Sequence, residues 1–511
     1  MSPDPGQPVS TGAANPAGKG AAVRAASRAG LYGLGAALQS LVGFLMLPIY
    51  TRYLSPADYG VVSLLAVLNG FVGLFFGMQV VTGLFRHYFA EKDEAGRKAV
   101  ISTAIGLAVV GKLLGLLTLW AFAGPAASFM FGEPGYTQYV MLFGITLVTD
   151  ALVFIPMQYL RALDRPVVFV LVSAAKLLLQ LVLNIWLVVF LGMGVMGVII
   201  SGVVGGSAIG LLMSGWALSR TGLRFDRATA GKLFNYSWPL VVASFISLYV
   251  TMGDRYFVRR FIGLDAVGLY ALAYRLAMVL QVLIAKPFNQ YWGAERFRVF
   301  QEGADLGIYR INFRFLSALL IAVGCGLALF APEFLKVMSD KAFWPAAALV
   351  PVLVLAKIVD QVGRFNALGL FVADKTPEQI RVSILEALAA SGFFVGLIPL
   401  IGAQGAALGL LAAALARLWW SGRKASEHLN LGLPWRDFWL AVGIAGLAVG
   451  AGMLGPSDFW ESLALKSGIY VAFTVLLFAS PLVGREGRSG LVGLLREARA
   501  RFGSRPGVGA G

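Results

Sequence analysis

Long apolar runs alternate with short polar segments along almost the whole chain. Each run is about 20 residues long, which is the length an α-helix needs to cross the hydrocarbon core of a bilayer. Backbone groups find no hydrogen-bond partner in lipid, and the runs are too long for the roughly 10-residue alternating strands of a barrel. The pattern predicts an all-α integral membrane protein with about fourteen transmembrane helices. The runs lie near 29–51, 60–84, 99–122, 138–160, 167–191, 195–219, 235–253, 267–290, 315–332, 344–372, 382–401, 403–422, 438–455 and 463–483.

The composition agrees with this pattern and narrows the possible chemistry. The 511 residues are 58% hydrophobic and 13% charged, with a mean hydropathy of +0.77, far more apolar than a soluble domain. One cysteine, Cys325, and two histidines allow neither an intramolecular disulfide nor a metal-ligand cluster, so we expect no cofactor and no metal. The net charge of +16 comes from cations scattered between the apolar runs instead of forming one basic face, so nucleic acid is not an expected partner.

The distribution of the cations predicts the topology. Of the 42 Lys and Arg residues, 29 lie in the two terminal tails and in the loops after the even-numbered runs, if Arg417 is counted with the loop that it borders. Seven lie on the opposite side, and six lie inside runs. Positive charge is concentrated on the cytoplasmic side of membrane proteins. Both termini are therefore predicted to lie in the cytoplasm.

An internal repeat divides the chain into two halves. Residues 53–60 (YLSPADYG) follow the first run, and residues 261–268 (FIGLDAVG) follow the seventh at an offset of 208. Further matches at offsets of 210 to 211 join 162–166 to 372–377 and 191–192 to 401–402. Because six runs separate the copies, both have the same orientation, and parallel repeats of this kind flank a central cavity in transporters.

These observations predict a division into six segments. They are a disordered cytoplasmic tail at 1–28, a six-helix bundle at 29–219, a cytoplasmic linker at 220–234, a second six-helix bundle at 235–422, two additional transmembrane helices within 438–483, and a basic cytoplasmic tail at 484–511.

The residues around the first repeat also carry a family resemblance. The stretch 47–60 (LPIYTRYLSPADYG) resembles the first-span signature of bacterial polysaccharide and O-antigen flippases of the multidrug/oligosaccharidyl-lipid/polysaccharide exporter superfamily. The stretches 85–88, 254–256 and 267–270 are similar to other recurrent features of that family, and the likeness covers residues 29 to about 425.

The resemblance implies a transporter and not an enzyme. Its expected activity is to flip a polyprenyl-pyrophosphate-linked oligosaccharide from the cytoplasmic to the outer leaflet of the bacterial inner membrane by alternating access, for O-antigen, capsule or exopolysaccharide synthesis. The implied partners are this lipid-linked oligosaccharide, membrane lipids, and the polymerase and export proteins of the same pathway.

Cations inside the apolar runs are the candidate substrate-binding residues. An ionisable side chain at the centre of a span costs about 2.5–3.5 kcal/mol, so we expect such groups to face water, a partner or an interface. Lys and Arg are the donors that a pyrophosphate requires. Gln180 and Asn184 follow Lys176 at four-residue spacing, so they are predicted to line the same wall of the cavity. The predicted cationic cavity comprises Lys112, Lys176, Arg275, Lys357 and Arg364 inside the runs, with Arg52 and Arg86 at the ends of runs, within the stretches that resemble the family.

Ionisable groups recur at equivalent depth in the two halves, and three of them are the acids Asp150, Asp360 and Glu386. Adding 210 to Asp150 gives Asp360, and adding 210 to Lys176 gives Glu386. These carboxylates either bind a proton or Na⁺ and couple transport to its gradient, or pair with neighbouring cations. Pairing is favoured, because Asp360 lies three and four residues from Lys357 and Arg364 on one helix face.

Three other functions stay open at this stage. A multidrug or cation antiporter of the same superfamily would need an acidic, aromatic cavity, whereas the intramembrane cations outnumber the acids six to three. A lipid II flippase also fits fourteen spans and a cationic cavity. A membrane glycosyltransferase is weaker, because the longest predicted loop, near 291–314, holds no cluster of acids or histidines.

Overall fold

The computed structural model describes residues 44–77, 80–303, 306–368, 370 and 376–484. This part of the chain is helical, and twelve of its helices are long and apolar enough to cross a membrane. The coarse prediction of an all-α, multi-pass membrane protein is therefore confirmed. The predicted first span lies mostly outside the described residues, and its end forms α2 (Leu47–Tyr53). The predicted tails 1–28 and 485–511 also lie outside them.

Helices from the first part of the chain form one group, here called the first group. In it α7 packs against α5 and α9, and α8 packs against α9. Small residues allow the close approach of α9 to α7, since a Cβ at Gly206 or Gly210 would meet Thr149 or Leu152. Its elements are α3 (Pro56–Gly77), α4 (Val80–Ala90), α5 (Glu94–Ala121), α6 (Ala123–Phe131), η1 (Pro134–Tyr136), α7 (Thr137–Ala162), α8 (Pro166–Asn184), η2 (Ile185–Phe190) and α9 (Gly194–Thr221).

The following helices form a second group, in which α18 packs along both α15 and α17. Helix α10 bridges the groups, because it contacts α3, α4 and α5 as well as α17. The elements are α10 (Arg227–Met252), α11 (Asp254–Phe261), α12 (Leu264–Ala277), η3 (Gln281–Ala285), α13 (Lys286–Gln301), α14 (Gly307–Met338), η4 (Lys341–Leu349), α15 (Val350–Asn366), α17 (Thr376–Ile401) and α18 (Ala403–Ser426).

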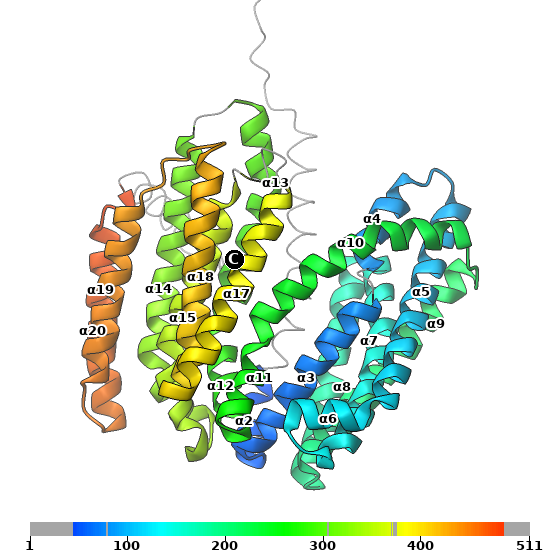
Figure 1. Cartoon of the computed structure of the whole chain (residues 1–511), viewed down its shortest axis with the longest axis horizontal. Coiled ribbons are helices and arrows are strands. Elements are labelled where there is room, and N and C mark those ends of the chain that lie inside the picture. The colour runs from blue at the N-terminus through cyan, green and yellow to red at the C-terminus, as the bar shows by residue number, and fades with distance from the viewer. Residues whose placement is uncertain (1–43, 78–79, 304–305, 369, 371–375, 485–511) are drawn as a thin grey trace, which may run out of the picture.

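Two further helices, α19 (Trp435–Met453) and α20 (Phe459–Ala479), lie along α14 at the edge of the molecule (Figure 1). A buried polar contact fixes α20. The Lys466 ammonium lies 2.6 Å from Glu333 Oε1 on α14, and the Ser462 hydroxyl donates to the same oxygen at 2.7 Å. Buried charges of this kind must be paired, so this contact specifies where the additional helices dock.

The two groups meet at one end of the molecule and diverge towards the other (Figure 1). At the meeting end α3 and α12 touch through their backbones, because a Cβ at Gly60 would collide with the Leu264 carbonyl oxygen, and one at Gly268 with that of Pro56. Nearby, the rings of Phe129 and Tyr256 stack with centroids 4.7 Å apart. We call this region the α3–α12 contact. The charge distribution predicts that it faces away from the cytoplasm.

Polar segments that the sequence suggested to be loops are partly helical. Helix α13 continues to Gln301 and α14 begins at Gly307, so the predicted loop at 291–314 is wrong. The polar residues of α13 are compatible with a helix because they face solvent and pair with one another. Arg298 pairs with both Glu295 and Glu302. Helix α10 likewise begins within the predicted linker 220–234. Helix α18, the predicted span 403–422, is not among the twelve candidate spans, because Gln404 and Arg417 lower its hydropathy.

Candidate functional site

A cavity of about 600 Å³ lies within the first group and is lined by α3, α4, α5, α7 and α8. We call it the first cavity. Its charged lining consists of Lys112, Asp150, Arg161 and Lys176. Three cations and one acid therefore surround a space inside one group of helices.

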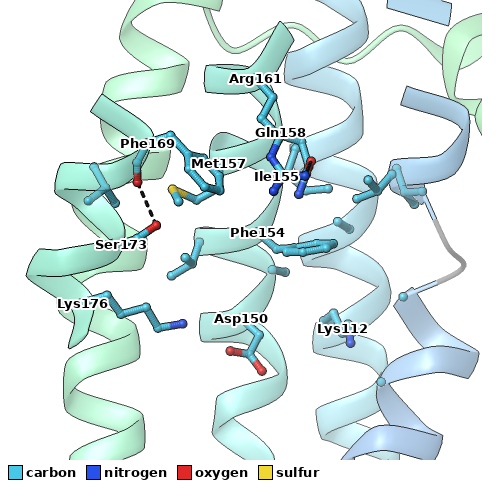
Figure 2. A pocket seen from close by; sticks show the side chains of 18 of the residues that line it. Lys112, Asp150, Phe154, Ile155, Met157, Gln158, Arg161, Phe169, Ser173 and Lys176 are labelled. Carbon is cyan, nitrogen blue, oxygen red and sulfur yellow. Dashed lines mark hydrogen bonds between the residues drawn. The ribbon is translucent and has the colours of Figure 1, made fainter. Parts of the chain in front are cut away.

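Asp150 on α7 lies between Lys112 of α5 and Lys176 of α8 (Figure 2). Among the residues that the structure describes, no direct ion pair joins Asp150 to either lysine. Glycines on α3 make room for the neighbouring lysine, since a Cβ at Gly73 would lie 2.6 Å from Lys112 Nζ. The three charges are close enough to interact but leave space between them for another polar group.

A second cavity, of about 740 Å³, lies between the two groups. Residues of α2, α3 and α8 line one side, and residues of α10, α11 and α12 line the other. Lys176 and Ser173 line both cavities, so the two spaces adjoin. The other polar and aromatic lining residues include Arg255, Arg275, Gln180, Tyr50, Tyr59 and Tyr274.

Arg255 is held rigidly beside the second cavity. Its Nη1 lies 3.0 Å from Asp254 Oδ1, and its Nε donates to the Ser63 hydroxyl of α3 at 3.1 Å. The Tyr270 hydroxyl donates to the other Asp254 oxygen at 2.6 Å, and the guanidinium lies 4.4 Å from the centroid of the Tyr274 ring. These contacts join the two groups and fix one positive charge in the cavity wall.

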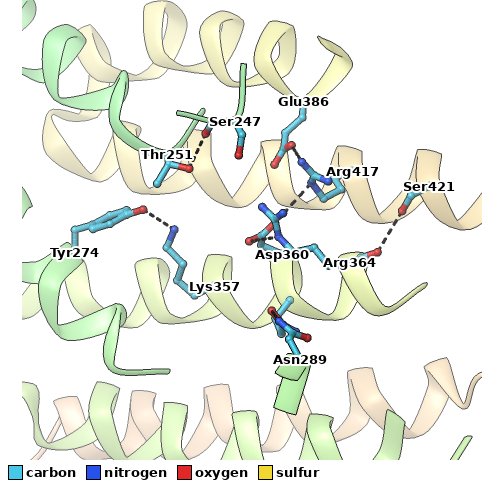
Figure 3. Close-up of polar contacts among 12 residues, drawn as sticks. Ser247, Thr251, Tyr274, Asn289, Lys357, Asp360, Arg364, Glu386, Arg417 and Ser421 are labelled. Carbon is cyan, nitrogen blue, oxygen red and sulfur yellow. Dashed lines mark hydrogen bonds and ion pairs between the residues drawn. The ribbon is translucent and has the colours of Figure 1, made fainter. Parts of the chain in front are cut away.

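A cluster of five charges lies in the second group, and we call it the second cluster (Figure 3). Arg364 Nε lies 3.1 Å from both Asp360 oxygens, while Arg417 pairs with Glu386 and lies 3.6 Å from Asp360. Lys357 turns away and donates to the Tyr274 hydroxyl at 2.7 Å. The exposed fractions of Glu386 and Arg417 are only 4% and 3%. The acids of this cluster are therefore engaged by guanidinium groups.

The structure thus brings the predicted site residues together in two places. Lys112, Asp150 and Lys176 surround the first cavity. The predicted residues Lys357, Asp360, Arg364 and Glu386 belong to the second cluster. Between these places, Arg275 lines the second cavity and lies over the Tyr59 ring, with a distance of 5.7 Å to its centroid.

Two predicted cations and one predicted amide lie elsewhere. Arg52 is exposed on α2, and Arg86 on α4 lies 4.8 Å from the ring centroid of Tyr236 on α10. Asn184 is fully buried, and its Oδ1 accepts from the Tyr50 hydroxyl at 2.9 Å. Only Gln180 of the predicted polar pair lines a cavity.

Several cavity residues were not selected from the sequence. In the count of Lys and Arg residues that predicts the topology, Arg161 belongs to a cytoplasmic loop and Arg255 to the opposite side of the membrane. Arg255 lies within the family-like stretch 254–256, and this resemblance was the one feature of the sequence that could have marked it as a site residue. The tyrosines gave no signal, because an aromatic residue in an apolar run is ordinarily part of the packing.

The chemistry available in the cavities is binding. Lys and Arg side chains donate charge-assisted hydrogen bonds to anionic oxygens, and tyrosines add hydroxyl groups and flat apolar faces. No group of three or more His, Cys, Asp or Glu side chains that could hold a metal ion occurs among the described residues.

Solved structures with the same fold are transporters. The chain is similar to the lipid II flippase MurJ in an inward closed conformation, with a TM-score of 0.71 and 12% identity over 88% of this chain and 99% of that chain. It is also similar to a multidrug resistance MATE family transporter of the MOP superfamily in an inward-facing conformation, with a TM-score of 0.59 and 15% identity over 76% and 95% of the two chains. The eukaryotic MATE transporter AtDTX14 matches with a TM-score of 0.53 and 11% identity over 86% and 97%. At 11–15% identity, these likenesses show that the chain shares the fold of these transporters.

The family is defined by the sequence. Comparison with curated proteins gives no match. Residues 49–347, more than half of the chain, match the family described as "Polysaccharide biosynthesis protein". The chain is therefore a multi-pass membrane protein that belongs to the polysaccharide biosynthesis protein family and has the fold of MurJ and the MATE transporters.

Proposed function

We propose that the protein flips a polyprenyl-pyrophosphate-linked oligosaccharide from the cytoplasmic to the outer leaflet of the bacterial inner membrane. The observation that carries this proposal is the pair of adjoining cavities in which cations outnumber acids. A pyrophosphate and a glycan cannot cross hydrocarbon unaided, because unpaired charges and polar groups are costly there. A cationic, water-filled path through the protein removes that cost.

The first cavity is suited to an anion. Lys112, Arg161 and Lys176 contribute three positive charges, against one negative charge from Asp150. A pyrophosphate near Lys176 would accept charge-assisted hydrogen bonds and complete the neutralisation of this cluster. Lys176 is the residue best placed to pass the anion on, because it lines both cavities.

The second cavity is suited to the glycan that follows the phosphate. Arg255 and Arg275 supply guanidinium donors, and Tyr50, Tyr59 and Tyr274 supply aromatic faces. Sugars present both hydroxyl groups and apolar ring faces, so a wall of guanidinium donors and aromatic rings complements them. The space between the helix groups also admits cargo of variable length.

Alternating access would use the two helix groups as moving parts. In this proposal, the bundles 29–219 and 235–422 are parallel repeats of six spans, with 438–483 as an addition, both termini in the cytoplasm and fourteen spans in total. With this orientation, the α3–α12 contact would close the outer end, and the end towards which the groups diverge (Figure 1) would face the cytoplasm. Rocking would break this contact and release the cargo outside.

Asp150 is the acid that we propose for coupling to a proton or Na⁺. It is exposed to the first cavity, and no described side chain forms a direct ion pair with it, whereas Asp360 and Glu386 are paired with Arg364 and Arg417. Binding of a cation at Asp150 would raise the positive charge beside the cargo, and its release would lower it. Polymerase and export proteins of the same pathway remain the proposed protein partners.

The alternative functions make different demands on the same cavities. The likeness to MATE transporters makes a cation exporter one alternative, but a cavity with three cations and one acid repels organic cations. The likeness to MurJ makes a lipid II flippase the other alternative, since lipid II shares the polyprenyl-pyrophosphate group and differs in the sugar.

Binding of lipid-linked cargo tests the proposal. Purified protein in detergent would be titrated with a polyprenyl-pyrophosphate-linked oligosaccharide, with lipid II, with a phosphate-free polyprenyl glycoside and with an organic cation. The oligosaccharide should bind most tightly, and Lys176→Ala should weaken it about ten-fold or more, the loss expected for a charge-assisted hydrogen bond. Lys424→Ala removes a lysine that pairs with Glu427 outside both cavities and should leave binding unchanged.

Three results would contradict the proposal. Binding of the organic cation without the oligosaccharide would favour a drug exporter. Preference for lipid II would favour a lipid II flippase, and equal binding of the phosphate-free glycoside would remove the role of the cations.

A further inference from the structure

A third cavity, of about 610 Å³, lies on the second group, away from the two cavities described above and with no lining residue in common with them. It is bounded by the end of α15, the last turns of α18, the segment 429–433 and the first turns of α19. These elements lie at the end of the molecule opposite the α3–α12 contact (Figure 1). The charge distribution predicts that this end faces the cytoplasm.

Tryptophans dominate the wall of this cavity. Trp419 on α18 and Trp439 on α19 are 60% and 40% exposed, and Trp435 completes the set. Indole rings concentrate at the level of lipid headgroups because they combine an apolar body with a polar N–H group. Leu415 and Leu418 add an apolar part to the wall along α18, and Leu415 lies one turn before Trp419, on the side away from the helix end.

The charge in this cavity is positive. Arg423 lines it and lies 5.9 Å from the centroid of the Trp419 ring, so stacking on the indole orients the guanidinium. Within the described part of the chain, no Asp or Glu lines the cavity. Asn366, Asn430 and Ser426 add neutral polar groups around the arginine. The wall therefore combines an anion-binding group, headgroup-level aromatics and an apolar extension.

We propose that this cavity binds the headgroup of an anionic phospholipid from the cytoplasmic leaflet. Arg423 would hold the phosphate, the tryptophans would pack beside the glycerol region, and the acyl chains would run along Leu415 and Leu418. The basic segment 485–511 of this chain is a poor occupant, because its cations would meet Arg423. The site lies outside both proposed transport cavities, so this inference does not rest on the proposed cargo.

Native mass spectrometry of the full-length protein tests the site. After delipidation in detergent, dioleoylphosphatidylglycerol and dioleoylphosphatidylcholine would be added in parallel. The anionic lipid should bind more tightly, and Arg423→Gln should weaken it about five-fold, the scale expected for one cation near an anionic lipid. Arg436→Gln removes an exposed arginine of α19 that does not line the cavity, and it should have no effect. Trp419→Ala should weaken both lipids, because both use the aromatic wall.

Four outcomes would overturn the proposal. Equal binding of the two lipids, or equal effects of Arg423→Gln and Arg436→Gln, would show that the cavity does not select the phosphate charge. Displacement of phosphatidylglycerol by the polyprenyl-pyrophosphate-linked oligosaccharide at this site would make it a cargo-docking site. Tighter lipid binding after removal of residues 485–511 would make the chain's own tail the occupant.

Discussion

Asp150 and Asp360 stand 210 residues apart, at equivalent places in the repeat that the sequence predicts, yet their surroundings differ. Asp360 is bound by Arg364 of its own helix and approached by Arg417 of α18. Asp150 faces the first cavity with lysines on both sides and no direct ion pair (Figure 2). One acid therefore joins helices through ion pairs, whereas the other lines a cavity.

This difference follows from the type and position of the cations. Arg417 and Arg364 reach the acids of the second cluster with guanidinium groups, which can donate several hydrogen bonds at once. The first cavity has flexible lysines that stop short of Asp150. Direct pairing satisfies the charge within the protein, whereas an incomplete cluster leaves donors available for a cargo. The first cavity is accordingly where we expect cargo chemistry, and the second cluster is where we expect stability.

Removal of Arg417 should produce the largest effect. Arg417→Ala leaves the buried Glu386 carboxylate without its partner, which we expect to cost about 3–5 kcal/mol of unfolding free energy. Denaturant unfolding of the purified protein in detergent measures the change. Arg423→Ala, an exposed arginine six residues further along α18, should cost less than about 1 kcal/mol.

A double variant separates charge pairing from packing. Glu386→Leu with Arg417→Met removes both charges and keeps similar volumes, so it should recover most of the loss. If the double variant were as unstable as Arg417→Ala, the pair would matter through its shape and not its charge.

The same substitution at the two equivalent acids should have unequal effects. Asp360→Asn replaces a carboxylate held by two arginines and should cost about 1.5–3 kcal/mol. Asp150→Asn should change stability by less than about 0.5 kcal/mol, because no direct ion pair is lost. It should instead tighten binding of the pyrophosphate-linked cargo, since it removes the negative charge of the first cavity. Unfolding and binding measured on the same preparations check both statements, and equal destabilisation would contradict the assignment of different roles.

The sequence predicted the helices well and the partners of their charged side chains only in part. Asp360 and Arg364 lie four residues apart on one helix, so their pairing could be predicted from spacing. Glu386 and Arg417 lie on different helices, and spacing carries no information about which helices touch. The stripe of Lys176, Gln180 and Asn184 was a correct helical face, but its environment changes along α8. It faces the cavities at Lys176 and the buried hydroxyl of Tyr50 at Asn184.

The α3–α12 contact is the place where the two halves are alike. Gly60 and Gly268 are equivalent in the predicted repeat, and each faces the backbone of the other helix. Gly60→Ala and Gly268→Ala should therefore have similar effects. Each added methyl group overpacks the contact, and we expect it to destabilise the closed conformation by about 1–3 kcal/mol. Because only the conformation closed at this end contains the contact, both variants should shift the protein towards opening there.

Cross-linking measures this shift. In a Cys325→Ala background, Phe129→Cys and Tyr256→Cys place thiols at the stacked ring pair beside the contact, and a short bifunctional reagent should join them in the closed conformation. Either alanine substitution should slow the cross-link, whereas Gly124→Ala on α6, where a Cβ meets no atom within 4 Å, should not. Slowing by only one of the two would show that the contact is not shared equally. Unchanged cross-linking in both variants would mean that the aromatic and polar contacts hold the groups together at this end. The repeated glycines would then make no contribution to closure.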